Sequence, residues 1–237
     1  ATDRLVFLDI DLEQALALKR YNQTLEDRVR ERTVDLQDAN MDSIYMLAVA
    51  SEAKDQDTGA HVRRIERYTR LLAEELGLAN AEAERVGYSA ILHDVGKMLV
   101  PDQILKKPGP LERDERGQMQ LHAIAGERIL SNKPFFETAR RIARSHHENW
   151  NGSGYPDGLA GEAIPLPARI VHLADVFDAL TSQRVYKPPW PTKQAVATIV
   201  AESGKAFDPT IVSAFESLIK QGKFDPPVVE TVPAESK

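Results

Sequence analysis

The sequence predicts an all-α protein, and three features of its 237 residues support that prediction. Apolar residues recur at intervals of three and four, which places them on one face of a helix. No convincing pair of stretches alternates apolar and polar residues as half-buried strands do. Glycine and proline gather between the periodic stretches, where turns are expected. We therefore expect a helical bundle that carries its chemistry at the ends of helices.

The first part of the chain has the pattern of a helix that pairs with another helix. Residues 12–54 contain neither proline nor glycine. A broken heptad, with intervals of seven, four and seven, is formed by Leu18, Leu25, Val29 and Leu36. We assign residues 1–45 to an N-terminal segment and signalling helix that forms a parallel homodimer, and we expect a sensor or receiver domain upstream of it. The alternative is a solvated single helix that packs on its own domain.

From residue 46 onward helix follows helix, and we assign residues 46–224 to one domain. Gly77 suits the C-cap of an early helix. Thr192 is expected to cap the penultimate helix, and Asp208 with Pro209 suits the N-cap and first position of the last one. The other expected helices cover residues 62–76, 81–93, 114–130, 135–147 and 166–182.

Two long stretches between these helices are expected to be loops. Residues 96–113 contain three prolines, and residues 148–165 contain four glycines and two prolines. A loop as long as the second one in a compact domain is usually functional. The tail over residues 225–237 has no core to join, and we expect it to be disordered.

The composition limits what the protein can be. A hydrophobic content of 42% is enough for a core. The net charge of −6 argues against binding a nucleic-acid polymer, but it permits a small phosphate ligand in a locally positive pocket. The chain has no cysteine, so disulfides and zinc–thiolate sites are excluded. No apolar run reaches the length of a membrane span and no signal peptide is visible, so we expect a cytoplasmic location.

Histidines and aspartates occur in pairs that suit a site for more than one metal ion. His93 precedes Asp94 after an apolar stretch, and His146 precedes His147. Neighbouring residues on a helix point about 100° apart, so the members of each pair can serve different ions, and an aspartate can bridge two of them. Asp175 lies in an apolar helix, where a carboxylate is costly unless it is paired or metal-bound. A single histidine is more often an ordinary core residue, so the prediction depends on the whole set.

Such a site suits the hydrolysis of a phosphodiester. Two cations about 3.5–4 Å apart can clamp the attacking and leaving oxygens and lower the pKa of a water toward about 7. Without sulfur ligands, iron, manganese, zinc and nickel all remain compatible with such a site, and the sequence does not choose among them.

The motifs resemble those of the HD-GYP family, the cyclic di-GMP phosphodiesterases of the HD superfamily of metal-dependent phosphohydrolases. The family name combines a His-Asp pair, here His93-Asp94, with the loop Gly154-Tyr155-Pro156. An isolated His-Asp pair is weak evidence, but the ordered set of motifs from Ser51 to Phe215 is specific. The resemblance implies the HD-superfamily helical bundle with a coiled-coil-like linker helix, and a role in bacterial signalling such as a two-component system.

The resemblance also implies a set of metal ligands. A two-metal core would use His61, His93, Asp94, His122, His146, His147 and Asp175. Some members of the family hold a third metal through a carboxylate four residues before the first histidine, and here that position is Asp57. Trinuclear members are expected to carry Glu there, so the shorter Asp57 puts the third metal in doubt. The alternative for Asp57 is a turn or cap residue.

Further residues are implied as contacts of the substrate. Lys97 would contact the scissile phosphate and act with Asp94 in catalysis, and Arg184 with Lys187 would bind the other phosphate groups of the ligand. Tyr155 would be a ligand contact or an anchor of its loop rather than a proton donor. The alternatives are a surface lysine for Lys97 and a purely structural turn for Tyr155.

The function that the resemblance implies is hydrolysis of cyclic di-GMP to linear pGpG, and further to GMP, by a metal-activated water. Two alternatives stay open. One is a module that senses a cyclic dinucleotide with little catalysis, and the other is a hydrolase of a related cyclic dinucleotide such as cyclic GMP-AMP. The complete set of candidate ligands argues against the sensor, because degenerate members usually lack ligands.

Overall fold

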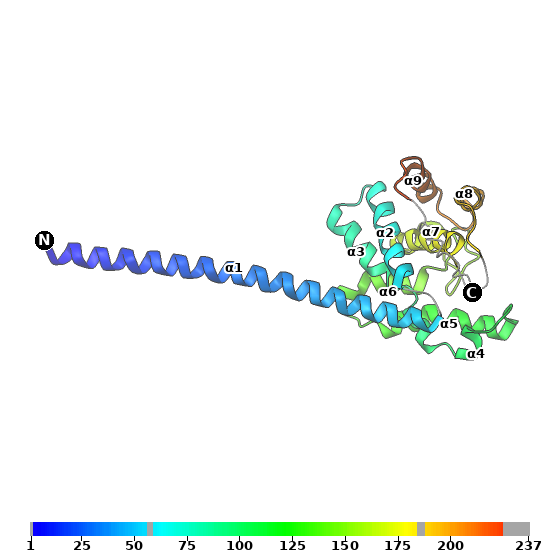
Figure 1. The fold of residues 1–237 in the computed structure, drawn as a ribbon, viewed down its shortest axis with the longest axis horizontal. Coiled ribbons are helices and arrows are strands. Elements are labelled where there is room, and N and C mark those ends of the chain that lie inside the picture. Colours follow the sequence, from blue (N-terminus) through cyan, green and yellow to red (C-terminus); the bar gives the residue numbers. More distant parts are fainter. Residues whose placement is uncertain (1, 56–58, 184–187, 225–237) are drawn as a thin grey trace, which may run out of the picture. The chain divides into compact units, whose positions relative to one another are not determined.

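The chain folds into helices, as expected. The structure, a computed structural model, describes residues 2–55, 59–183 and 188–224. Within these ranges the only strand-like pairings are the isolated bridges Asn151–Ala160 and Ser203–Phe207, so the all-α prediction is confirmed (Figure 1). The α-helices are α1 (Thr2–Glu52), α2 (Gly59–Glu75), α3 (Asn80–Ala90), α4 (Asp102–Leu105), α5 (Arg113–Ile129), α6 (Glu137–Ser145), α7 (Leu166–Thr181), α8 (Thr192–Ala201) and α9 (Pro209–Lys220). The short 3₁₀ helices are η1 (Ala53–Asp55), η2 (Val95–Leu99), η3 (Pro134–Phe136) and η4 (Gly161–Ala163).

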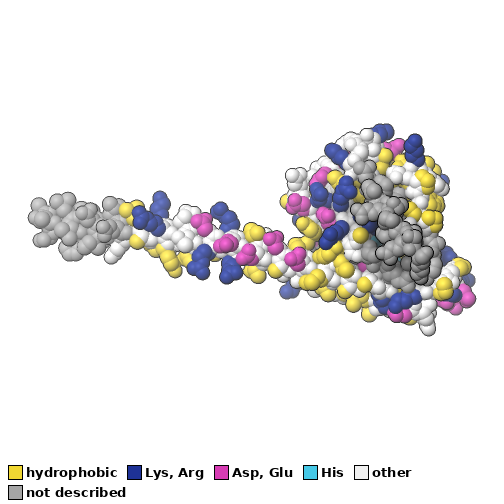
Figure 2. All heavy atoms as spheres, in the orientation of Figure 1, with side chains coloured by type: hydrophobic (Ala, Val, Ile, Leu, Met, Phe, Trp, Pro, Cys, Tyr) yellow, Lys and Arg dark blue, Asp and Glu magenta, His cyan; other side chains and the backbone are white. Residues whose placement is uncertain are grey.

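The chain divides into two compact units, residues 1–46 and 47–237. In the first unit, the side chains of residues 14–40 are all exposed. Figure 2 shows charged side chains of both signs along α1, with apolar side chains between them. The stretch is rich in Leu, Ala, Glu and Arg, the strong helix formers, and it lacks the residues that break helices. The assignment of residues 1–45 and 46–224 to separate domains stays a prediction.

In the second unit, α7 is the central helix. It packs against α2, α3, α6, α8 and α9, and its residues Ile170, Leu173 and Phe177 are fully buried. Phe177 lies 5.5 Å from Tyr68 of α2 and 5.2 Å from Phe215 of α9, measured between ring centroids. Aromatic pairs of this kind contribute about 0.5–1.5 kcal/mol each beyond their buried area. These contacts fix α7, and with it Asp175 and Asp178, against α2.

Several elements differ from the predictions, including η4 within the expected loop over residues 148–165 and α6, which begins only at Glu137. The expected loop over residues 96–113 was wrong in part, because it contains η2 and α4. The helix expected to reach His93 ends at Ala90, because His93 N–H bonds to Ala90 O in an i→i+3 turn. The prediction that Thr192 caps the penultimate helix was wrong. Thr192 is the first residue of α8, and Pro191 occupies the N-cap position without a side-chain hydrogen bond.

The capping prediction for the last helix is confirmed. Asp208 precedes α9, its Oδ1 accepts a hydrogen bond of 2.8 Å from Thr210 N–H, and Pro209 occupies the first helical position. The tail predicted to be disordered, residues 225–237, lies outside the described residues. Over the ranges that are described, none of the helices combines the length and the apolar character needed to cross a membrane.

Candidate metal centre

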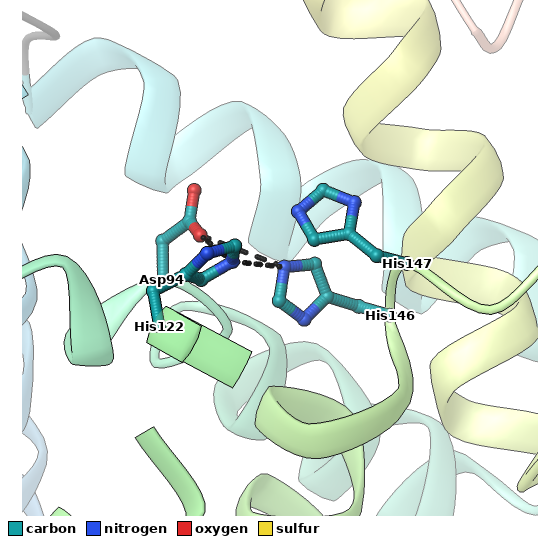
Figure 3. Close-up of side chains that lie close together, drawn as sticks. All are labelled: Asp94, His122, His146 and His147. Carbon is teal, nitrogen blue, oxygen red and sulfur yellow. Dashed lines mark hydrogen bonds and ion pairs between the residues drawn. The ribbon is translucent and has the colours of Figure 1, made fainter. Parts of the chain in front are cut away.

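Four side chains from three parts of the chain meet in one buried cluster. Asp94 comes from the turn before η2, His122 from α5, and His146 with His147 from the end of α6. Figure 3 shows the four side chains directed toward one another. Their potential ligand atoms all lie within 4.8 Å of one another. Asp94, His122 and His146 are buried, and His147 is half-buried. We call these four residues the first group.

A second group lies next to the first and consists of Glu52, His61 and His93. Glu52 is the last residue of α1, His61 belongs to α2, and His93 precedes Asp94. All three are buried, and their potential ligand atoms also lie within 4.8 Å of one another. Asp175 of α7 stands beside this group, with its Oδ1 3.9 Å from His93 Nε2.

Asp94 joins the two groups through its two carboxylate oxygens. Asp94 Oδ1 lies 3.2 Å from His122 Nε2 and 3.5 Å from His146 Nε2, in the first group. Asp94 Oδ2 lies 3.2 Å from His93 Nε2 in the second group and 2.8 Å from Lys97 Nζ. A carboxylate with one oxygen toward each group has the arrangement of a ligand that bridges two cations.

Four of the histidines are oriented by hydrogen bonds at Nδ1. His93 Nδ1 lies 2.9 Å from Ala90 O, His122 Nδ1 2.7 Å from Met119 O, and His146 Nδ1 3.1 Å from Ile142 O. His61 Nδ1 lies 2.7 Å from Asp178 Oδ2. A carbonyl oxygen only accepts, so Nδ1 must carry the proton in the first three rings, and Nε2 is left as the ligand nitrogen.

The residues fit divalent cations, as three buried atoms indicate. Glu52 Oε2, His93 Nε2 and Asp94 Oδ1 make no hydrogen bond with the described residues, although Asp94 lies 3.2 Å from both His93 and His122. In addition, His122 Nε2 and His146 Nε2 face each other at 3.4 Å. Buried polar atoms without partners are rare and costly. Cations held by nitrogen and oxygen ligands would satisfy all of these atoms at once.

The pKa values of the cluster histidines shift in opposite directions, so His93 must lose a proton when a cation binds, whereas His146 and His147 need not. Burial opposes ionisation of Asp94, but Lys97 and His93 hold its pKa well below the ordinary value. Burial likewise opposes a charge on His93, yet the Asp94 carboxylate raises the pKa of His93 to about 10. Burial lowers the pKa of His146 and of His147. Those two imidazoles are therefore neutral at pH 7, which is the form that binds a metal.

A close approach between backbones brings the first group together. A Cβ on Gly96 would collide with His122 O and would lie 2.5 Å from Gly126 N. Only glycine therefore allows η2 to press against α5 at the turn that carries His122. Gly126 lies on the same side of α5, where a Cβ would be 3.1 Å from Ala143 Cβ of α6.

The loop after His147 folds back over the cluster. The Glu148 carboxylate accepts hydrogen bonds from the backbone N–H groups of Asp157 at 2.7 Å, Gly158 at 3.1 Å and Leu159 at 3.1 Å. A Cβ on Gly154 would approach His147 O and Asn149 N too closely to fit. The Tyr155 ring stacks on His147 at 4.8 Å with an interplanar angle of 28°. Burial raises the pKa of the Tyr155 phenol, so it stays neutral.

The structure brings most of the predicted site residues together. The described ones lie in the two groups or against them, with Asp175 beside His93, Lys97 on Asp94 and Tyr155 on His147. Three predicted residues lie outside the described residues: Asp57, Arg184 and Lys187. The roles assigned to these residues stay predictions.

Two site residues were missed or left unassigned by the sequence analysis. Glu52 was missed, because no motif around it in the sequence marks it as a buried carboxylate, although its side chain is 2% exposed. Asp178 has one ring nitrogen of His61 and the Arg64 guanidinium as partners. The sixth histidine, His172, lies outside both groups and its Nδ1 contacts Glu148 O at 3.0 Å.

The fold and the cluster define an all-α protein with a paired His/Asp site of the kind that binds metal ions. The HD domain family matches residues 46–211, which is most of the chain. The chain belongs to the HD domain family, and the resemblance indicated by its motifs is confirmed.

Named relatives and solved structures agree with this assignment. The chain is 43% identical over 199 residues to the 3′3′-cGAMP-specific phosphodiesterase 2 of Vibrio cholerae, covering 83% of this chain and 38% of that protein. It is 42% identical over 204 residues to the cyclic di-GMP phosphodiesterase response regulator RpfG of Xanthomonas campestris, covering 85% and 54%. It is 39% identical over 207 residues to a cyclic di-GMP phosphodiesterase of Thermotoga maritima, covering 86% and 56%. The chain thus spans between 38% and 56% of the length of these relatives.

Two solved structures share the fold. The cyclic GMP-AMP-specific phosphodiesterase V-cGAP3 of V. cholerae has a TM-score of 0.60 at 23% identity, covering 78% of this chain and 49% of that one. Bd1817 of Bdellovibrio bacteriovorus, described as an HDG"Y"P protein, has a TM-score of 0.55 at 21% identity, covering 68% and 51%. At these identities the similarity supports the all-α HD fold.

Proposed function

We propose that this chain is a metal-dependent phosphodiesterase that hydrolyses a cyclic dinucleotide. The observation that carries the proposal is Asp94, whose two oxygens face two separate groups of histidines at 3.2 Å. That arrangement suits two adjacent cations, and two-cation sites are a common solution for phosphodiester cleavage. Membership of the HD domain family and the names of the relatives support the same chemistry.

Bound divalent cations would supply a water of lowered pKa and would neutralise the charge that develops on the phosphodiester. The histidines of the first group and of the second group would hold these cations, with Asp94 between them and Asp175 beside the second group. Iron or manganese is our first expectation, with zinc or nickel also compatible with the nitrogen and oxygen donors.

The chain's own side chains would orient the substrate. Lys97 Nζ lies 2.8 Å from Asp94 Oδ2, and its side chain is 16% exposed, so its ammonium can reach a phosphate that enters from solvent. Asp175, 20% exposed, lies on the accessible side as well. We assign Lys97 to the scissile phosphate and Asp94 to the catalytic centre. Tyr155, neutral and stacked on His147, would contact the ligand or anchor its loop.

Three further assignments depend on residues outside the described ranges. Arg184 and Lys187 would bind the other phosphate groups of the ligand. Asp57 would contribute to a third cation if one binds. These roles come from the order of the motifs in the sequence.

The first candidate substrate is cyclic di-GMP, with linear pGpG and then GMP as products. A related substrate, 3′3′-cyclic GMP-AMP, is the second candidate, because relatives named for each dinucleotide are 43% and 42% identical to this chain. The retention of every described ligand argues against a sensor without catalysis. We further propose a cytoplasmic homodimer paired through α1, with an upstream sensor or receiver domain.

The test is anaerobic purification with metal analysis, followed by chromatographic assays with cyclic di-GMP and with cyclic GMP-AMP. At least two metal equivalents and the appearance of linear or mononucleotide products are expected. Asp94→Asn should abolish turnover with an unchanged circular dichroism spectrum, because it removes the charge that joins the groups. Asp114→Asn is the matched control, since Asp114 is an exposed aspartate in the first turn of α5. A fully metallated protein that binds a dinucleotide without cleaving it would refute the proposed phosphodiesterase activity.

A further inference from the structure

Glu52 has a buried carboxylate oxygen that no described residue satisfies with a hydrogen bond. Its side chain is 2% exposed, and its Oε2 makes no hydrogen bond with the described residues. The carboxylates of Asp178 and Glu148 are equally buried, but each has several hydrogen-bond partners. A buried carboxylate without a partner is costly, so Glu52 is expected to have a ligand of positive charge.

The geometry around Glu52 identifies the place of that charge. The carboxylate, one ring nitrogen of His61 and one of His93 lie within 4.8 Å of one another. Ligands of one cation at about 2.0–2.2 Å from the metal lie about 3–4 Å apart, so a small closure is enough. The Nδ1 atoms of His61 and His93 are engaged elsewhere, and His93 Nε2 has no hydrogen-bond partner. Two buried atoms that make no hydrogen bond with the described residues, Glu52 Oε2 and His93 Nε2, thus belong to the same group.

The segment after Glu52 is tied to the turn that carries the His-Asp pair. Lys54 Nζ donates hydrogen bonds to Met98 O at 2.9 Å and to Val100 O at 2.7 Å. These carbonyls lie at the end of η2, which begins directly after Asp94. The Lys54 contacts therefore hold the end of α1 beside the second group, as a fixed ligand requires.

We propose that Glu52 is a direct ligand of the cation held by His61 and His93. The proposal rests on the assignment of the cluster as a metal centre, and it adds a residue that none of the motifs supplied. The cation in the second group would then have three carboxylates around it, from Glu52, Asp94 and Asp175. The first group is richer in nitrogen. The second group therefore favours a harder cation such as Mn²⁺ than the first group does.

The experiment is an Mn²⁺ titration of the chelator-stripped chain, followed by native mass spectrometry that counts bound ions. Wild type is expected to bind at least two. Glu52→Gln, which is isosteric, should bind one Mn²⁺ more than about tenfold more weakly and leave the affinity for the others unchanged. His61→Gln should weaken the binding of the same Mn²⁺ ion. The double variant that combines Glu52→Gln and His61→Gln should lose no further ion. Glu66→Gln is the matched control, since Glu66 is a part-buried glutamate of α2 paired with Arg70.

The outcomes separate this inference from the proposed function. A wild-type chain that binds no Mn²⁺ would refute the metal centre itself. Wild-type Mn²⁺ affinities in Glu52→Gln, with two ions still bound, would refute only the ligand role of Glu52. If Glu52→Gln does not fold, Glu52→Asp decides, because the shortened carboxylate should weaken the same ion and unchanged affinities would overturn the proposal.

Discussion

Four histidines of the two groups have a hydrogen-bond partner at Nδ1: His61, His93, His122 and His146. His61 is the one described case in which that partner is a side chain, since Asp178 Oδ2 lies 2.7 Å from its Nδ1. Asp178 also accepts from Arg64 Nη2 at 3.0 Å, which keeps the carboxylate in place. Burial opposes its ionisation, but the bond to His61 lowers the pKa of Asp178, so it is charged at pH 7. A charged partner increases the basicity of the imidazole and its strength as a ligand.

Asp178→Asn is therefore expected to weaken the binding of one cation by about 10–100-fold, because partners of ligating histidines typically have effects of this size. Calorimetric titration of the chelator-stripped chain with Mn²⁺ measures it. Asp208→Asn is the matched control, since Asp208 is also buried and paired with an arginine, Arg169, but contacts no histidine. Equal losses of metal affinity in the two variants would show that Asp178 acts only on stability.

The metal-free protein should carry a pH signature of Glu52. Burial, followed by the charge of Asp94, raises the pKa of Glu52 above its ordinary value of 4.5 in the folded state. The unfolded chain releases this proton near pH 4.5, whereas the folded chain keeps it to higher pH. Stability from this group is thus fully present below pH 4.5 and is lost as pH rises through the folded pKa. Thermal unfolding in chelator should show that Glu52→Gln becomes more stable than wild type, by a margin that grows as the pH rises above 4.5. A pH-independent difference would contradict this.

At the scale of elements, the contact between η2 and α5 sets the geometry of the first group. Gly96→Ala would place a Cβ against His122 O and so force the two elements apart. We expect a loss of about 1–3 kcal/mol of unfolding free energy, as overpacking typically causes, and weaker metal binding through displacement of His122. Gly117→Ala on the exposed side of α5 is the control, because nothing lies within 4 Å of its Cβ. It should stabilise the helix by about 0.5–1 kcal/mol. Denaturant unfolding of both variants measures the contrast.

The elements also show what the sequence could predict. The helical periodicity predicted the bundle, and the residue pairs His93-Asp94 and His146-His147 predicted where the cluster lies. The 3₁₀ turn that carries His93 could not be predicted, because it depends on the packing of η2 against α5. Glu52 was not predicted as a site residue for a similar reason. Nothing in the local sequence distinguishes a glutamate at a helix end that faces solvent from one that faces histidines. The chemical character of the site residues could be predicted from the sequence, whereas their tertiary contacts could not.

At the scale of the whole molecule, none of the described side chains over residues 14–46 of the N-terminal unit is buried. Every described side chain between residues 14 and 40 is exposed. Isolated helices gain little stability from propensity alone, so a helix of this length in water is expected to have a partner. The apolar spacing of α1 places Val29 on the predicted seam, together with Leu18, Leu25 and Leu36. Val34 falls on the opposite side of the helix, five residues further on.

This difference between two valines gives a matched test of the proposed dimer. Val29 is 64% exposed and Val34 is 49% exposed in the single chain, so neither is held by a core. Val29→Glu should dissociate the dimer, because it would bring two like charges together across the seam. Val34→Glu should leave the dimer intact, since its side chain faces away from the seam. Sedimentation at micromolar concentration distinguishes the two. A monomeric wild type would refute pairing through α1, and equal dissociation in both variants would refute this seam.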